Sequence, residues 1–209
     1  MEKPRTRDAE QTRRAILDAA TAEFSEKGFS GGRVDDIAAR TVTTKRMIYY
    51  YFGGKEQLYA AVLEEKYGDI RDAEAAEKLD ALPPLDALRR LVEITFDHHA
   101  ARPEFVRLVT VENIHEAGHV KASPTIRKRN AAVIGTIRTL LARGEAAGVF
   151  RKGVDPLDLH LLITGFCFHR VSNRHTLAAI FGQNLHSRPR AAAHRRMITE
   201  AVLRYMAPS

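Results

Sequence analysis

The sequence predicts an all-α protein in which a small N-terminal group of three helices is followed by a larger helical bundle. Apolar residues recur at three- and four-residue spacing over most of the chain, which is the period of a helix that buries one face. The alternation of apolar and polar residues that would indicate strands is scarce. Capping residues followed directly by proline recur along the chain, as they do at the first turn of helices.

Two helices are expected within the first 40 residues. The first runs from about Asp8 to Lys27, and its buried stripe has four-residue spacing: Ile16, Ala20 and Phe24. Gly28 follows, at the position where a left-handed residue commonly ends a helix. The second helix starts near residues 32–34 and ends near Arg40. Two aspartates in its first turn favour the positive end of the helix dipole.

A third helix is predicted over residues 44–50. Either Thr43 or Thr44 can cap it, because a threonine hydroxyl accepts a backbone N–H that has no partner inside the helix. Glycines at 53–54 then interrupt the chain, and a fourth helix begins at Lys55. The apolar residues of that fourth helix are Leu58, Tyr59, Val62 and Leu63.

The rest of the chain is expected to form five more helices. Four of them start near Pro84, Pro103, Pro124 and Pro156, and the last spans about residues 190–206. The buried side of the first of these five should contain Leu85, Leu88, Val92 and Phe96. The buried side of the last should contain Met197, Ile198, Ala201, Val202 and Tyr205.

The composition excludes several classes of protein. The 209 residues contain one cysteine, which excludes a disulfide scaffold and a cysteine-based zinc cluster. The longest charge-free apolar run, Leu161–Phe168, is far shorter than the roughly 20 residues of a membrane-spanning helix. The charged N-terminus lacks the apolar core of a secretory signal. We therefore expect a soluble cytoplasmic protein, and no motif of the chain indicates a cofactor.

The positive charge becomes informative only when it is located. The formal net charge is +7 and the pI is about 9.7. Residues 1–60 contain 11 basic and 9 acidic residues and the remainder 22 and 17, so neither part is a basic tail. Between Ile37 and Lys55, however, four basic residues and three consecutive tyrosines occur without any acidic residue. This pattern predicts contact with nucleic acid, and a solvated helix face is the alternative.

Residues 12–65 resemble the TetR family of repressors. Two short helices joined by a tight turn, a tyrosine-rich end and a helix after a glycine break together form helix-turn-helix geometry. The agreeing residues are Ile16–Ala20, Phe24, Gly28, Phe29, Val34, Asp36–Ala38, Thr44–Phe52 and Lys55–Leu58. The resemblance implies a helix-turn-helix DNA-binding domain at residues 1–54 and a helical ligand-binding and dimerisation domain at residues 55–209. It implies a ligand-responsive repressor, not an enzyme, that binds a palindromic double-stranded operator as a homodimer.

DNA contacts are predicted for the third helix and for the start of the fourth; the resemblance implies that Tyr49 and Lys55 hold phosphates and that residues 45–47 face the bases. The residues concerned are Thr44, Lys45, Arg46, Met47, Tyr49, Tyr50, Tyr51 and Lys55. Lys45 or Arg46 can read guanine, and arginine does so with two parallel hydrogen bonds. Tyrosine hydroxyls and the Lys55 ammonium suit phosphate oxygens. Core packing is the alternative for Tyr49 and, above all, for Tyr51, whereas Ile48 and Phe52 are expected to pack inward.

Two positions depart from the family pattern. Thr41-Val42 stands where the family usually has Ala-Gly, so Val42 must adopt another turn or tolerate a positive φ. Gly32-Arg33 stands where the family often has a threonine cap, and a glycine cap costs only about a few tenths of a kcal/mol. Both departures concern the stability of the small domain, because neither removes a DNA-contacting residue.

The larger domain is expected to form the dimer and to bind the effector. Residues 157–168 are apolar on nearly every face of a helix, which requires cover on all sides. We expect this helix and the last one to pair with the same helices of a second subunit; a central core helix in a monomer is the alternative. The effector pocket is predicted from polar or aromatic residues on inward faces: Phe96, His99, Phe105, Glu112, Asn113, Phe166, Cys167, His169 and Asn173. Ordinary core packing is the alternative for each of them.

A helical metal-dependent enzyme that uses the histidine- and glutamate-rich second domain is the alternative of a different class. A di-iron bundle needs Glu-x-x-His pairs on two different helices and further inward carboxylates, whereas the pair Glu112 and His115 and the adjacent pair Glu116 and His119 lie in one short segment. The other candidate ligands are His98, His99, His160 and His169. Nothing in their spacing requires a metal, so none is predicted.

Overall fold

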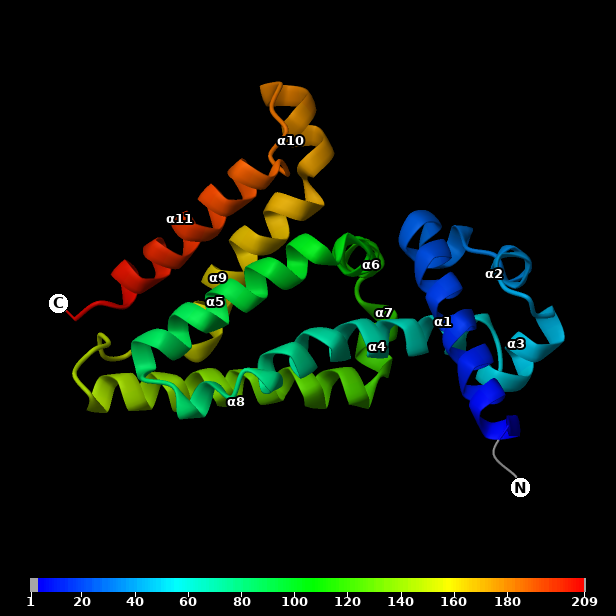
Figure 1. The fold of residues 1–209 in the computed structure, drawn as a ribbon, viewed down its shortest axis with the longest axis horizontal. Helices are drawn as coiled ribbons and strands as arrows, with labels where there is room; N and C mark the ends of the chain where they lie inside the picture. The colour runs from blue at the N-terminus through cyan, green and yellow to red at the C-terminus, as the bar shows by residue number, and fades with distance from the viewer. Residues whose placement is uncertain (1–3, 209) are drawn as a thin grey trace. The chain divides into compact units, whose positions relative to one another are not determined.

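The computed structural model describes residues 4–208, with side chains from Asp8 to Pro208. Every regular element in this part of the chain is a helix, which confirms the predicted fold class. The contacts divide the chain into two compact units (Figure 1). Unit 1 combines the residues up to 67 with residues 107–127, and unit 2 combines residues 68–106 with the chain from 128 onwards. Each unit has its own hydrophobic core.

Unit 1 contains the N-terminal helices and the segments that pack on them. Its elements are α1 (Pro4–Gly31), α2 (Val34–Arg40), α3 (Lys45–Phe52), the first part of α4 (Lys55–Ala76), the end of α6 (Pro103–Ile114) and α7 (Gly118–Ala122). Its buried core includes Ile16, Ala20, Phe24, Ile37, Ile48, Leu58, Tyr59, Val62 and Leu63. The apolar stripes predicted for the first four helices are therefore confirmed.

Gly28 ends the regular part of α1. Its φ of 69° is positive, as predicted, but its ψ of 179° is extended and not left-handed helical. Glycine adopts this combination readily because it has no Cβ. The carbonyl of Gly28 accepts the N–H of Gly32 at 3.0 Å, so the bend passes directly into the short connection before α2.

The start of α2 shows how the chain compensates for the missing threonine cap. Arg33 occupies the cap position without a capping side chain, and its N–H donates instead to the carboxylate of Glu23 on α1 at 3.2 Å. Glu23 is fully buried and also pairs with Lys27 at 2.8 Å and with Arg40 at 3.1 Å. Because Arg33 and Arg40 stand at opposite ends of α2, one buried carboxylate holds both ends of that helix.

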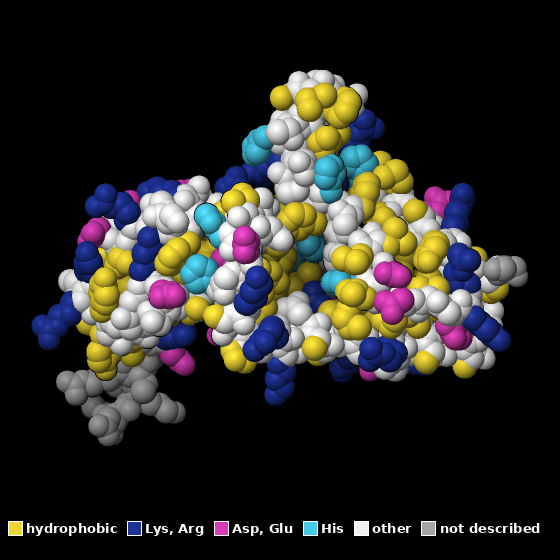
Figure 2. Space-filling model, turned by 180° about the vertical axis from the view of Figure 1, so that it is seen from behind, with side chains coloured by type: hydrophobic (Ala, Val, Ile, Leu, Met, Phe, Trp, Pro, Cys, Tyr) yellow, Lys and Arg dark blue, Asp and Glu magenta, His cyan; other side chains and the backbone are white. Residues whose placement is uncertain are grey.

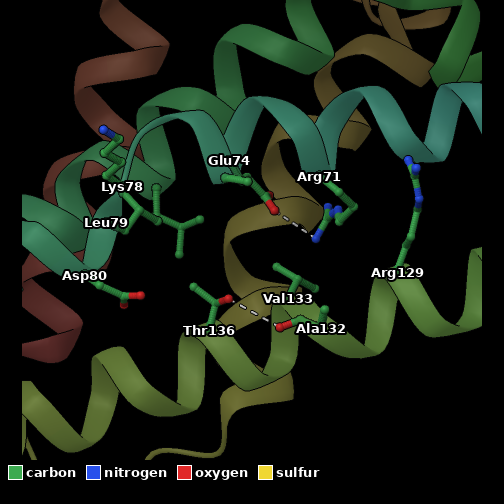
Figure 3. A pocket seen from close by; sticks show the side chains of 11 residues that line it. Arg71, Glu74, Lys78, Leu79, Asp80, Arg129, Ala132, Val133 and Thr136 are labelled. Atoms are coloured by element: carbon green, nitrogen blue, oxygen red, sulfur yellow. Dashed lines mark hydrogen bonds and ion pairs between the residues drawn. The ribbon is translucent and has the colours of Figure 1, made fainter.

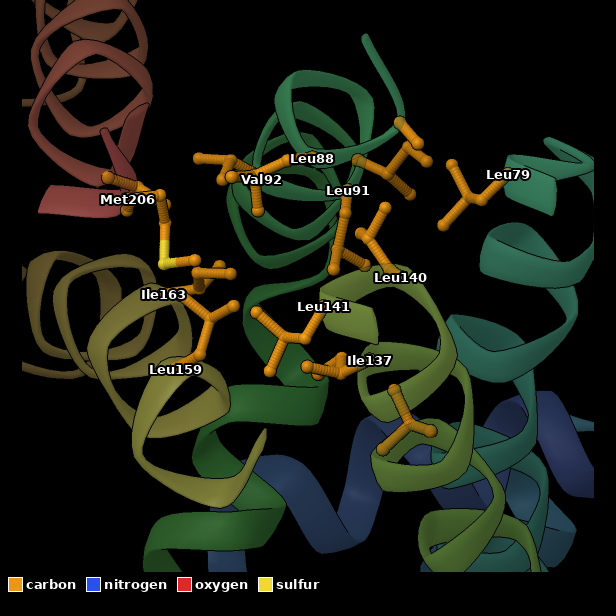
Figure 4. Packing of buried hydrophobic residues seen from close by; sticks show 14 of the residues in the cluster. Leu79, Leu88, Leu91, Val92, Ile137, Leu140, Leu141, Leu159, Ile163 and Met206 are labelled. Carbon is orange, nitrogen blue, oxygen red and sulfur yellow. The ribbon is translucent and has the colours of Figure 1, made fainter. Parts of the chain in front are cut away.

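Unit 2 is a bundle around α5. Its elements are the end of α4, the 3-10 helix η1 (Leu79–Ala81), α5 (Pro84–Ala101), the start of α6, most of α8 (Pro124–Ala146), α9 (Pro156–Ser172), α10 (Arg174–Phe181) and α11 (Arg188–Met206). Leucine and other aliphatic side chains of α5, α8 and α9 meet in its core (Figure 4). Asp155 caps α9, as predicted, by accepting the N–H groups of Leu157 and Asp158 at 2.7 and 3.2 Å.

Two kinds of expectation are wrong in unit 2 and its neighbouring segments. The short elements η1, α7 and α10 are not predicted, because α7 and α10 bury no residue and η1 buries only Leu79, so none of them has a readable apolar period. Four residues expected to be buried are exposed: Leu85, Met197, Ala201 and Tyr205. In α11 the stripe that contains Ile198 and Val202 packs into the core. Periodicity alone does not show which of two adjacent apolar stripes is buried.

The helix α4 runs without interruption from Lys55 to Ala76, and its first part belongs to unit 1 while its end belongs to unit 2. The predicted functional domains, residues 1–54 and 55–209, therefore do not coincide with the two compact units. The division into functional domains stays a prediction. In the described part of the chain, no helix has the length and apolarity needed to cross a membrane.

Candidate nucleic-acid interface

The helix α3 has one face in the core of unit 1 and the other in solvent. Ile48 and Phe52 are buried, as predicted, and the guanidinium of Arg13 lies 5.0 Å over the Phe52 ring. The opposite face exposes 46% of Tyr49 and 77% of Tyr50. Two aromatic side chains held in solvent on one short helix are typical of a surface that meets a partner.

Thr44 caps α3. Its hydroxyl accepts the N–H of Met47 at 3.3 Å, which decides between the two threonines that the sequence leaves open. The capped end is the one that carries Lys45 and Arg46, so the cap stabilises the first turn on which these two residues stand.

Thr44→Ala should lower the free energy of unfolding by about 1 kcal/mol, because one backbone N–H of the first turn loses its acceptor. Urea denaturation of the full chain, followed by circular dichroism, measures this change. Thr43→Ala is the matched control, since the hydroxyl of Thr43 does not cap the helix. Equal destabilisation by the two substitutions would contradict the assignment of the cap.

Lys45 and Arg46 are neighbours in sequence but differ in their contacts. The Lys45 ammonium lies 3.1 Å from the carboxylate of Asp35 on α2, and both side chains are about half exposed. Arg46 is exposed, and within residues 8–208 it has no ion-pair partner. Arg46 therefore keeps its donors for a base, whereas Lys45 must exchange Asp35 for DNA. Met47 between the two faces is half-buried.

Tyr51 and Lys55 lie nearer to the core than the exposed tyrosines. Tyr51 is half-buried against the core of unit 1, with its ring 5.3 Å from that of Tyr50 in an edge-to-face arrangement. The Lys55 ammonium lies 4.8 Å over the Phe29 ring and 3.4 Å from the carbonyl oxygen of Ser30. Both of these partners are uncharged, so the ammonium remains suited to a phosphate oxygen.

Val42 is an interface candidate in the turn between α2 and α3, where its residue type predicts either another turn or strain. Its φ is not positive, since Lys78, Glu116 and Ala117 are the described non-glycine residues with positive φ. The hydroxyl of Thr41 ends α2 by donating to the carbonyl of Ile37 at 3.2 Å. The turn thus forms without the strain considered above and leaves Val42 fully exposed. An apolar side chain in the turn before α3 is of the type that contacts thymine methyl groups.

The predicted ligand-binding residues differ in their placement. Four are buried in unit 2: Phe96, His99, Phe105 and Cys167. Phe166 and Asn173 are half-buried, and Asn113 and His169 are exposed. The expectation of an inward face is therefore wrong for Asn113 and His169. Their polar groups have partners on their own helices, because Asn113 donates to the carbonyl of Val109 at 2.8 Å and the Asn173 amide lies 3.0 Å from Nδ1 of His169.

Burial sets the protonation of two of these residues. It raises the pKa of the Cys167 thiol to about 12, so the thiol stays protonated and unreactive at neutral pH. Burial also lowers the pKa of His99. Nδ1 of His99 lies 2.7 Å from the carbonyl of Thr95 and must therefore carry the proton of a neutral ring.

Glu112 is buried in unit 1 and joins three helices. Its carboxylate accepts from the ring of His119 at 3.0 Å and from the N–H of Val120 at 3.3 Å. Burial, together with the nearby Glu112, raises the pKa of the Tyr59 hydroxyl on α4. His115, the other half of the Glu-x-x-His pair, is exposed. Among the residues that the structure describes, no three His, Cys, Asp or Glu side chains are grouped to hold a metal ion.

A cavity of about 310 Å³ lies between α4 and α8 in unit 2 (Figure 3). Its wall contains the ion pair of Arg71 and Glu74, 3.0 Å apart, and the apolar side chains of Leu91 and Val133. Burial raises the pKa of Glu74, and the charge of Arg71 opposes that rise. None of the predicted ligand-binding residues lines this cavity.

The chain matches two family models that together span most of its length. A model described as bacterial regulatory proteins, tetR family, matches residues 16–62. A second, described as tetracyclin repressor-like, C-terminal domain, matches residues 84–202. The chain is 37% identical over 200 residues to the HTH-type transcriptional repressor NicS of Pseudomonas putida, covering 96% of this chain and 94% of that protein. It is 33% identical over 165 residues to the HTH-type transcriptional repressor SCO4008 of Streptomyces coelicolor, covering 75% and 77%.

Solved structures share the fold. The transcriptional regulator SCO4942 of Streptomyces coelicolor superposes with a TM-score of 0.73 at 31% identity, over 93% of this chain and 98% of that one. A TetR transcriptional regulator of Chloroflexus aurantiacus superposes with a TM-score of 0.72 at 22% identity, over 97% of this chain and all of that one.

Proposed function

The chain belongs to the TetR family of DNA-binding transcriptional regulators, which are not enzymes, and we propose that it is a ligand-responsive repressor that binds a palindromic operator as a homodimer. The observation that carries this proposal is α3, which is anchored by Ile48 and Phe52 and exposes Arg46, Tyr49 and Tyr50. Two copies of α3 would enter successive major grooves about 34 Å apart. The relatives NicS and SCO4008 are named repressors, which favours repression over activation. A DNA target favours action in the cytoplasm.

Exposed apolar side chains on α9 and α11 favour a homodimer formed through these two helices. Between 41% and 57% of each is accessible: Leu157, Leu161, Leu162, Met197 and Tyr205. Hydrophobic side chains also gather at the end of α10 (Figure 2), where Ile180 and Phe181 are exposed. Apolar surface of this extent is typical of a protein–protein interface. A second copy can cover it by a two-fold operation, in which the same two helices meet from both sides.

Two helices shared by the compact units offer a route from effector to operator. Both α4 and α6 begin in one unit and end in the other. Within unit 1, Ser123 donates to Glu64 of α4 at 2.6 Å, and Glu112 of α6 lies beside Tyr59 of α4. A ligand that prefers one position of α6 would therefore shift α4 as well. The separation of the two α3 helices would change, and operator affinity would fall in proportion to the ligand's preference for that state.

Operator binding is tested with a DNA fragment from upstream of the protein's own gene, titrated at several salt concentrations. We expect this fragment to bind more tightly than random DNA of equal length. Equal affinities would contradict sequence-specific operator binding. A thermal-shift screen of small metabolites tests for the effector, because a ligand that binds only the folded state raises its stability.

Lys55→Ala and Arg46→Ala should impair DNA binding in different ways. Loss of a phosphate contact at Lys55 should weaken binding similarly for all sequences and reduce the slope of log affinity against log salt by about one. Loss of Arg46 should instead relax the preference at one base position, at a cost of about 1–3 kcal/mol for the best operator. Competition binding with operators randomised at each position measures both effects. Lys128→Ala, an exposed lysine on α8, is the control for the loss of one positive charge.

A further inference from the structure

Arg170 on α9 is a buried arginine without a counter-charge. Only 4% of its surface is accessible, and its Nε is buried without a hydrogen-bond acceptor. Within residues 8–208, no carboxylate lies at ion-pair distance from its guanidinium. The Phe96 ring, 4.6 Å below the guanidinium, supplies a weaker electrostatic contact. A buried charge that lacks its partner is strongly destabilising, so the folded chain retains Arg170 at a cost in stability.

A second buried polar atom without a partner lies on the neighbouring helix α11. Nδ1 of His194 has no hydrogen-bond partner in the described part of the chain. Its ring meets the Phe166 ring edge-to-face at a centroid distance of 5.9 Å. Burial first, and then the charge of Arg170, lower the pKa of His194. Phe166 and Arg170 are four residues apart on α9 and so share one face of that helix, which places the His194 ring on the side of α9 that carries the guanidinium. The lowered pKa favours the neutral ring, which adds a polar contact without adding charge.

A second imidazole nearby also has a lowered pKa. His186, in the connection before α11, lies with Nε2 3.2 Å from the carbonyl of Arg170. Burial lowers its pKa too. Arg170 is the buried charge of this cluster, which also contains the two imidazoles and the protonated Cys167 thiol; Arg174 and Arg190 act on the same imidazoles from positions that are less buried.

We propose that Arg170 binds the carboxylate of a small organic acid, with His194 as the second polar contact and the rings of Phe96 and Phe166 against the apolar body of that acid. This inference rests on the proposed function, because it names the chemical class of the effector. A guanidinium matches the geometry of a carboxylate with two parallel hydrogen bonds. Away from water the attraction between the two charges is several times stronger than in solution. A neutral amide of the same shape would leave the buried charge uncompensated.

The experiment uses the full chain and four compounds: benzoate, benzamide, hexanoate and hexanamide. Thermal shift and calorimetric titration at millimolar concentration are expected to show binding of at least one carboxylate, with its amide at least about tenfold weaker. Inorganic phosphate serves as the anion without an apolar body. Failure of both carboxylates to bind, equal binding of acid and amide, or phosphate binding as tight as that of the acids would each overturn the proposal.

Arg170→Met separates a ligand anchor from a structural residue. Without ligand, the variant should melt at the same temperature as the parent chain or higher, because a buried charge without a counter-charge is replaced by an apolar side chain of similar length. With the carboxylate, it should lose the stabilisation seen in the parent chain. Arg196→Met, which removes an exposed arginine of α11, should change neither measurement. A lower melting temperature of unliganded Arg170→Met, a shift toward monomer, or unchanged carboxylate binding would refute the assignment.

These outcomes are distinguishable from failure of the proposed function. Operator binding by the unliganded chain is measured separately and does not involve Arg170. If the operator binds but no carboxylate does, the effector class is wrong and the regulator remains. If a carboxylate binds through Arg170 without lowering operator affinity, ligand-induced release is wrong and the binding site remains.

Discussion

Leu161→Glu is expected to give a monomer at micromolar concentration and to weaken operator binding at least about 100-fold. Leu161 is 57% exposed on α9, in the middle of the surface proposed to meet a second copy. In a two-fold interface each substitution acts twice, so two carboxylates would lose water against apolar partners. A monomer can hold only one half-site, and it loses the gain in affinity, about 100- to 10,000-fold, that linked binding provides.

Light scattering and gel-shift titration of the same preparation measure the two parts of this prediction. Leu85→Glu is the matched control, because Leu85 is an exposed leucine of unit 2 that lies on α5 and not on α9 or α11. A dimer that survives Leu161→Glu would show that another surface pairs the subunits. A monomer that binds the operator as tightly as the parent chain would refute the palindromic mode of binding.

Gly144→Ala is expected to destabilise the chain by about 3 kcal/mol, although alanine is the better helix former. Gly144 lies in α8 against the ring of Phe150, which is only 2% exposed. A Cβ at this position would stand 1.8 Å from one ring carbon and 2.4 Å from another. The ring must therefore leave its place in the core, at a cost near that of overpacking or of losing a buried phenylalanine, about 1–5 kcal/mol.

Gly135→Ala, in the same helix, provides a control of opposite sign. A Cβ there meets nothing within 4 Å, so the substitution should stabilise the chain by about 0.5–1 kcal/mol through helix propensity alone. Urea denaturation compares the two variants. Similar effects of both substitutions would show that Phe150 does not require the space above Gly144.

The recognition surface could be predicted in outline but not in its ion pairs. The order of apolar and polar residues in α3 predicts that Ile48 and Phe52 are buried, and the structure confirms it. The pairing of Lys45 with Asp35 was not predicted, because it depends on how α2 crosses α3 and not on the spacing within either helix. The DNA contacts of Thr44, Lys45, Arg46, Met47, Tyr49, Tyr50, Tyr51 and Lys55 stay predictions until the substitutions above are measured.

The effector side of the molecule was less predictable for the same reason. In the sequence, Arg170 stands in the last turn of a helix, where a basic residue commonly interacts with the negative end of the helix dipole and with solvent. Its burial under α5, over Phe96, follows only from the packing of α9. The exposed positions of Asn113 and His169 likewise follow from which stripe of each helix meets its neighbours.

The sequence by itself determined the helical fold class, a threonine cap of α3 at residue 43 or 44, the cap at Asp155, the bend at Gly28 and the membership of the TetR family. These features depend on residues within a few positions of one another, since caps and helical periodicity are local. Only the tertiary structure decided that Glu23 replaces the missing cap of α2, that α11 buries Ile198 and exposes Met197, and that Arg170 has no counter-charge. Each of these depends on partners that approach from another helix, and the free energy of a buried charge or an apolar face is set by those neighbours.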